Sequence, residues 1–145
     1  MAYLSIAAGA HGLFWYTYAA ANGDRDGLGA ADDPDRWRDL AAVARELASL
    51  QDDLGTRSAV APQVRILEGP EKDSFGNASV HCVLKQGVGG RLLIAVNAAA
   101  QKVRAQFAVG AARKAQVLFE DREVRVASGL VDEFEPNGVH VYRLR

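Results

Sequence analysis

The chain has 145 residues, of which 49% are hydrophobic, so one ordinary domain can bury a core here without metals or disulfides. With 17 basic and 18 acidic residues, the net charge of -1 excludes the strong positive field of a nucleic-acid-binding protein. The single cysteine excludes an internal disulfide, and one cysteine with three histidines is too few for a Cys/His zinc cage.

The N-terminal residues 1–18 are apolar, but they have no basic leader and no apolar run of membrane-spanning length. We therefore expect a soluble chain with no signal peptide and no membrane partner, and the localisation stays open. The alanine-rich segment Met1–Ala10 predicts a helix. The aromatic segment Leu13–Tyr18 predicts a short strand, and its apolar character on both faces is typical of a buried parallel sheet.

A turn-rich loop over Ala19–Asp35 follows this segment, and it contains glycine, asparagine and five aspartates. Asp33 before Pro34 predicts the start of a helix. The next residues, Arg36–Leu54, have helical spacing with one apolar stripe, and Gly55 stands where such a helix would end.

After Gly55 the apolar residues alternate with polar ones, which predicts short strands separated by glycine-rich or polar turns. This spacing favours an antiparallel sandwich or barrel. Cys82 alternates with apolar neighbours in one of these strands, so we expect a buried, inert thiol. The expected strands are Val64–Leu67, Ser79–Lys85, Arg91–Asn97, Val103–Phe107, Ala115–Glu120, Glu123–Val126, Val131–Phe134 and Val139–Leu144.

Four segments in this order resemble the C-terminal end of a (β/α)₈-barrel glycoside hydrolase. They are YLSIAAGAHGLFWYTY, RWRDLAAVARELASLQDDL, RLLIAVNAAAQKVRAQF and VLFEDREVRVASGLVDEFEPNGVHVYRLR. The resemblance implies an α+β fold, in which a helix–strand–helix remnant of a barrel (residues 1–55) precedes an antiparallel β-sandwich (residues 60–145). It covers mostly fold-forming residues, so it is not itself evidence of activity.

The candidate catalytic residues are aspartates of the 22–33 loop, because barrel active sites lie at the C-terminal ends of strands. A glycosidase needs two carboxylates, whose separation decides between the retaining and inverting mechanisms. The alternative is a solvated loop, and no position here matches the acid and nucleophile that related hydrolases place on earlier strands. These candidates are Asp24, Asp26, Asp32 and Asp33.

The resemblance also implies an aromatic platform for a sugar at the end of the strand, with Trp15 as the best match and Tyr16 and Tyr18 beside it. Asn22 and Arg25 could donate hydrogen bonds to the hydroxyls of such a ligand. The alternatives are core packing for the aromatic residues and turn formation for the polar ones.

Other chemistry-bearing residues have structural interpretations. Glu120–Glu123 predicts a solvated hairpin tip with weak ion pairs, and Asp132 resembles a residue that pins the last hairpin. His81 and His140 occur within strands and would need a shared cleft to form a site. We expect no metal and no cofactor.

Two functions follow as hypotheses. In the first, the chain is a glycoside-hydrolase-like protein that acts on or binds carbohydrate. In the second, it is a non-catalytic structural module of a larger hydrolase. An unpaired strand at Leu13–Tyr18 would also favour self-association or association with a barrel domain.

Overall fold

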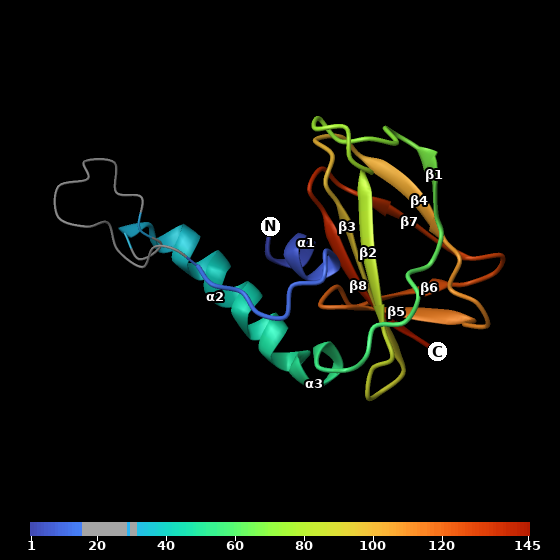
Figure 1. Ribbon diagram of the computed structural model, residues 1–145, viewed down its shortest axis with the longest axis horizontal. Coiled ribbons are helices and arrows are strands. Elements are labelled where there is room, and N and C mark those ends of the chain that lie inside the picture. Colours follow the sequence, from blue (N-terminus) through green and yellow to red (C-terminus); the bar gives the residue numbers. More distant parts are fainter. Residues whose placement is uncertain (16–28, 30–31) are drawn as a thin grey trace. The chain divides into compact units, whose positions relative to one another are not determined.

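The computed structural model describes residues 1–15, 29 and 32–145 (Figure 1). These residues form two compact units. One combines Met1–His11 with Asp52–Arg145, and the other spans Gly12–Gln51. The predicted division into residues 1–55 and 60–145 stays a prediction, but the first residues of the chain pack with the later strands.

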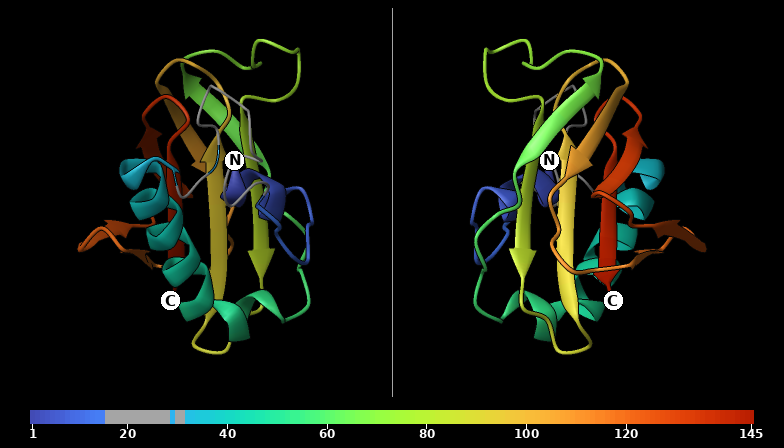
Figure 2. Two further views of the ribbon diagram at one scale, coloured as in Figure 1. Left: turned by 90° about the vertical axis from the view of Figure 1, so that its left-hand side faces the viewer. Right: turned by 90° about the vertical axis from the view of Figure 1, so that its right-hand side faces the viewer.

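The first unit contains two antiparallel sheets (Figure 2). One sheet has the order β1-β4-β7, and the other has the order β2-β3-β8-β5-β6. The predicted antiparallel β-sandwich is thereby confirmed, because the two sheets enclose one hydrophobic core. The strands are β1 (Val64–Glu68), β2 (Val80–Lys85), β3 (Arg91–Asn97), β4 (Val103–Phe107), β5 (Lys114–Leu118), β6 (Arg122–Arg125), β7 (Leu130–Phe134) and β8 (Val139–Leu144).

The core lies between the inner faces of the two sheets. Phe107 and Phe134 come from the smaller sheet, and their rings meet edge to face with centroids 5.9 Å apart. Leu93 and Tyr142 come from the larger sheet, where they stand opposite each other in the β3–β8 register, and all four side chains are fully buried. The alternation read from the sequence therefore places the inward residues correctly.

Part of the outer face of the larger sheet, on strand β3, is apolar as well. On β3, Leu92, Ile94 and Val96 alternate with the inward residues and are nevertheless buried. The short helix α1 (Ala2–Ala7) contacts β2 and β3 and supplies two buried side chains, Tyr3 and Ile6. The central strands are thus covered on both faces, as in a sheet between two layers.

The second unit contains the helix α2 (Pro34–Ser49), which begins where the sequence predicts. The Asp33 carboxylate caps it by accepting hydrogen bonds from the backbone N–H of Asp35 (3.0 Å) and Arg36 (3.2 Å). Pro34 occupies the first turn, where its missing N–H costs nothing. One helix was predicted over Arg36–Leu54, but α2 ends at Ser49 and a separate turn of helix, α3 (Gln51–Leu54), follows.

The predicted strand Leu13–Tyr18 does not form at its first three residues. Leu13, Phe14 and Trp15 belong to no strand or helix, and Tyr16–Tyr18 lie outside the described residues. The physical reason is that a strand needs a ladder partner, and no described strand pairs with Leu13–Trp15. The barrel remnant therefore stays a prediction.

A buried ion pair joins α3 to the larger sheet. The Arg143 guanidinium donates to both carboxylate oxygens of Asp53 at 2.8 and 2.5 Å, and Asp53 also accepts from the backbone N–H of Val88 at 2.6 Å. Asp53 is only 6% exposed. The hydrogen bonds from Arg143 hold the pKa of Asp53 below its ordinary value, despite the opposing effect of burial.

This pair predicts a specific loss of stability in acid. Because the folded-state pKa of Asp53 lies below the unfolded value of about 3.9, its contribution is present above that pH and is lost as pH falls through the folded pKa. We expect Asp53→Asn to lower the free energy of unfolding by about 2–4 kcal/mol at pH 7, and this difference to shrink below pH 4. Urea unfolding from pH 7 to 2.5 measures both effects. The exposed neighbour is the control: Asp52→Asn should show no comparable difference, and a difference for Asp53→Asn that persists at pH 2.5 would refute the linkage.

Candidate functional site

Three of the sequence-predicted site residues lie within the described part of the chain: Trp15, Asp32 and Asp33. The Trp15 side chain is 42% exposed, so its ring is not buried in a core within the described structure. Its proposed role as a sugar platform stays a prediction. The remaining candidates lie outside the described residues: Tyr16, Tyr18, Asn22, Asp24, Arg25 and Asp26.

Asp33 has a structural task that the sequence also predicts. The backbone N–H groups of Arg36 and Asp35 hold the pKa of Asp33 below its ordinary value, so this carboxylate is a hydrogen-bond acceptor rather than a proton donor. Asp32 donates its backbone N–H to the carbonyl of Gly29 at 3.1 Å. These bonds account for the aspartates as parts of a helix start, and their catalytic role stays a prediction.

The densest cluster of chemistry-bearing side chains lies in the sandwich instead. Arg122 of β6 donates to both carboxylate oxygens of Asp132 on β7, at 3.2 and 2.8 Å. Arg122 also donates to Glu120 at 2.8 Å, and the Tyr142 hydroxyl of β8 donates to Asp132 at 2.7 Å. These bonds join the edge strands of the two sheets, because β6 and β7 belong to different sheets. We call this set, together with His140, the inter-sheet polar cluster.

His140 completes the cluster from β8. Its Nδ1 faces the Glu120 carboxylate, and its Nε2 lies 2.9 Å from the backbone carbonyl of Glu133. The ring also packs against Phe134, with centroids 4.7 Å apart. His81 does not share this environment, because the register pairs it with Val96 on the outer face of the same sheet.

The electrostatics of the cluster favour fixed charges. Burial, followed by the charge of Asp132, raises the pKa of Tyr142 far above its ordinary value, so the phenol stays a proton donor. Although burial opposes it, hydrogen bonding to Asp132 and Glu120 raises the pKa of Arg122, which stays cationic. Asp132 thus holds strands together through hydrogen bonds, as predicted, but β7 and β8 belong to different sheets and do not form the predicted last hairpin. The expected solvated tip at Glu120–Glu123 is confirmed for Glu120, Asp121 and Glu123, which are exposed. Glu120 pairs with Arg122 and Glu123 pairs with Lys114, whereas Arg122 is half-buried and also bonds to Asp132 of the other sheet.

Cys82 is partly buried, and burial raises the pKa of its thiol to about 11. The thiol is therefore protonated at neutral pH, as expected for an inert structural cysteine. Among the described residues, no group of three or more His, Cys, Asp or Glu side chains could hold a metal ion.

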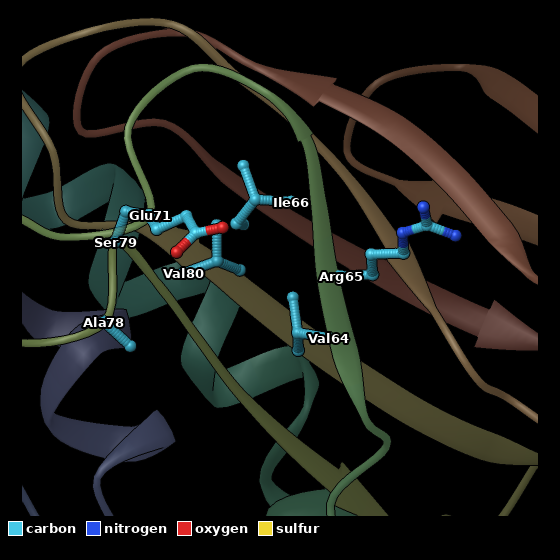
Figure 3. Close-up of a pocket in the computed structure, with 7 residues that line it drawn as sticks. All are labelled: Val64, Arg65, Ile66, Glu71, Ala78, Ser79 and Val80. Carbon is cyan, nitrogen blue, oxygen red and sulfur yellow. The ribbon is translucent and has the colours of Figure 1, made fainter.

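A cleft of about 540 Å³ lies between β1 and the start of β2 (Figure 3). Val64 and Ile66 line it from β1, and Ala78, Ser79 and Val80 line it from the opposite side, with Glu71 between. Sequence reasoning did not find this cleft, since its walls are separated along the chain and only the fold joins them. The one signal was an alternation that marked Val64 and Ile66 as inward residues.

A second cleft, of about 360 Å³, contains two carboxylates, but both are already paired. Glu68 accepts from Arg104 at 2.9 Å, and Glu133 accepts from Lys102 at 2.8 Å. A glycosidase needs one carboxylic acid to donate a proton, whereas the Lys102 ammonium holds the pKa of Glu133 below its ordinary value. Glu133 is therefore not suited to be the proton donor of a glycosidase pair.

No known protein family, curated protein or solved structure matches the chain. Within the described residues, no helix is both long enough and apolar enough to cross a membrane.

Proposed function

We propose that the chain is a non-catalytic β-sandwich module of the glycoside-hydrolase type, which supports a barrel domain. The observation that carries this proposal is the apolar patch formed by Leu92, Ile94 and Val96 on the outer face of β3, the strand that α1 contacts and beside which it buries Tyr3 and Ile6. The resemblance identifies α1 as the helix that precedes the last barrel strand. In this interpretation, the sandwich holds the end of a barrel through this face.

The bonding of the described carboxylates also supports a structural role. Asp33 caps a helix, Asp53 pairs with Arg143, and Asp132 is held by Arg122 and Tyr142. Each of these groups accepts hydrogen bonds in a fixed network, whereas glycosidic cleavage requires one carboxyl group that donates a proton.

Hydrolysis of nitrophenyl glycosides of several sugars tests the proposal. We expect the purified chain to release no more nitrophenol than a variant with Asp24→Asn, Asp26→Asn, Asp32→Asn and Asp33→Asn. Asparagine retains the N-cap at position 33, so this variant keeps the helix start. Turnover by the natural chain that the variant loses would support the enzyme hypothesis and overturn the module.

The packing that carries the proposal has its own test. Ile6→Asp places a charge against the apolar outer face, so we expect a loss of about 3 kcal/mol in the free energy of unfolding and increased binding of a hydrophobic dye. Ala2→Asp, in the more exposed first turn of α1, is the control and should change stability by less than about 0.5 kcal/mol. Equal effects of both variants would show that α1 does not depend on this face.

A further inference from the structure

The edge of β1 that borders the 540 Å³ cleft is open. Among the described strands, β1 pairs with β4 alone. The backbone N–H of Ala108 donates to the carbonyl of Gln63 at 3.0 Å. With the β1–β4 register, this bond shows which residues of β1 form hydrogen bonds with β4. By alternation, Arg65 directs its peptide groups toward β4, whereas Val64 and Ile66 direct theirs toward the open edge. An exposed edge of this kind is a template for an added strand.

The side chains at this edge separate into two faces. Figure 3 shows Val64 and Ile66 on the cleft side of β1 and Arg65 on the other side. The far wall is formed by Val80, which is 6% exposed. A strand added to β1 would therefore place alternate side chains into the cleft beside Val64, Ile66 and Val80, and the intervening ones beside the Arg65 guanidinium.

The cleft has one charged end. The Glu71 carboxylate is exposed, takes part in none of the ion pairs among the described residues, and is directed toward the space between Val80 and Ile66 (Figure 3). Beside it, Ser79 is fully buried, and its hydroxyl has no hydrogen-bond partner in the described part of the chain. The backbone holds these two residues together, because Ser79 donates its N–H to the Glu71 carbonyl at 2.9 Å.

These features select the ligand chemistry. The aliphatic side chains of Val64, Ile66 and Val80 suit an aliphatic stem. The Glu71 carboxylate, beside an unused hydroxyl acceptor, suits a compact cation with several N–H donors. A lysine side chain combines both properties. Beside it, an acidic residue would face Arg65.

We propose that the cleft binds an extended peptide segment that adds antiparallel to the open edge of β1. Its lysine stands opposite Ile66 and reaches Glu71 and Ser79, an acidic residue stands opposite Arg65, and an aliphatic residue stands opposite Val64. Because an antiparallel strand runs in the reverse direction, the peptide reads Lys-Glu-Val. This inference does not depend on the proposed module function, and the glycoside assay does not test it.

Calorimetric titration of the full chain with acetyl-Thr-Lys-Glu-Val-Thr-amide tests the proposal. We expect saturable binding, and at least about tenfold weaker binding when norleucine replaces the lysine, because the charge-assisted bonds are lost. Glu71→Gln should cause the same loss and remove the difference between the two peptides. Glu68→Gln is the matched control, since Glu68 pairs with Arg104 in the other cleft. Absence of saturable binding, or equal affinity for both peptides, would overturn the proposal.

Two further experiments distinguish the backbone hydrogen bonds of the peptide from the bonds made by its lysine ammonium group. A methyl group on the lysine backbone nitrogen blocks the bond to Ile66 and should abolish binding, whereas methylation of the glutamate nitrogen, which faces away, should not. If butylammonium competes as well as the peptide does, a free amine rather than a strand is the ligand, and the proposal fails. Ser79→Ala should weaken binding about threefold without loss of folding stability, because the hydroxyl has no partner to lose.

Discussion

Asp132→Ala is expected to lower the free energy of unfolding by about 3–5 kcal/mol. The Asp132 carboxylate, 13% exposed, accepts two bonds from Arg122 and one from the Tyr142 hydroxyl. Its removal leaves a half-buried guanidinium without its main partner and a buried phenol without its acceptor. Chemical denaturation at pH 7 measures this loss of stability. An unchanged dependence of the free energy of unfolding on denaturant concentration would show that the denatured state is the same.

The same strands supply a matched control for this prediction. Glu123 of β6 pairs with Lys114 at 2.9 Å, and both side chains are about half exposed. Glu123→Ala should therefore cost no more than about 1 kcal/mol. A double-mutant cycle of Arg122→Ala with Asp132→Ala should show strong coupling, because the two groups share bonds. Additive effects, or a loss for Asp132→Ala as small as that for Glu123→Ala, would show that the cluster does not hold the sheets together.

The β-sandwich was predictable from the sequence because its strands are half-buried and antiparallel. In Val103–Phe107, the inward residues Val103, Ala105 and Phe107 are fully buried and alternate with Arg104 and Gln106, so pattern and structure agree residue by residue. Strand Arg91–Asn97 was also placed correctly, but its burial on both faces was not foreseen. That burial depends on α1, whose contact with β3 leaves no local signal.

Long-range polar contacts were not predictable in the same way. The run Glu120–Glu123 has the composition of a solvated turn, yet its members bond to Asp132 and His140, which are ten to twenty positions away. Glu120 also sits between Phe119 and Asp121, which both have positive φ (68° and 47°), a conformation that is uncommon for phenylalanine. The composition of this segment indicates that burial of its charges would be unfavourable. It does not show which distant residues form the bonds that offset this cost.

The candidate site shows the same limit. Leu13–Tyr18 has the composition of a strand, but composition cannot supply the neighbours that a strand requires. Conversely, nothing in the residues around Glu71 or Ser79 indicates a site, since the cleft exists only where the edges of two sheets diverge. Self-association through the Leu13–Tyr18 segment stays a prediction, which sedimentation at micromolar concentration would test.

Asn97→Ala should be comparably destabilising, by about 3–5 kcal/mol, with a fall in melting temperature of about 10 °C. The Asn97 side chain is fully buried and bonds two separate turns to the end of β3. Its Nδ2 donates to the carbonyls of Gln101 (2.8 Å) and Glu135 (3.0 Å), and its Oδ1 accepts from the N–H of Ala99 (2.9 Å). Alanine leaves all three backbone groups without this partner and opens a cavity. Thermal and urea unfolding measure the loss.

Substitution by aspartate separates hydrogen bonding from packing at this position. Asn97→Asp keeps the volume but turns the donor toward two carbonyls into an acceptor, so we expect it to be at least as destabilising as Asn97→Ala at pH 7. Gln101→Ala is the control, because the exposed side chain of Gln101 is not used and only its carbonyl is bonded; its change should stay within about 0.5 kcal/mol. If aspartate is tolerated better than alanine, side-chain volume rather than the amide donor holds these two turns, and the sandwich is closed at this end by packing.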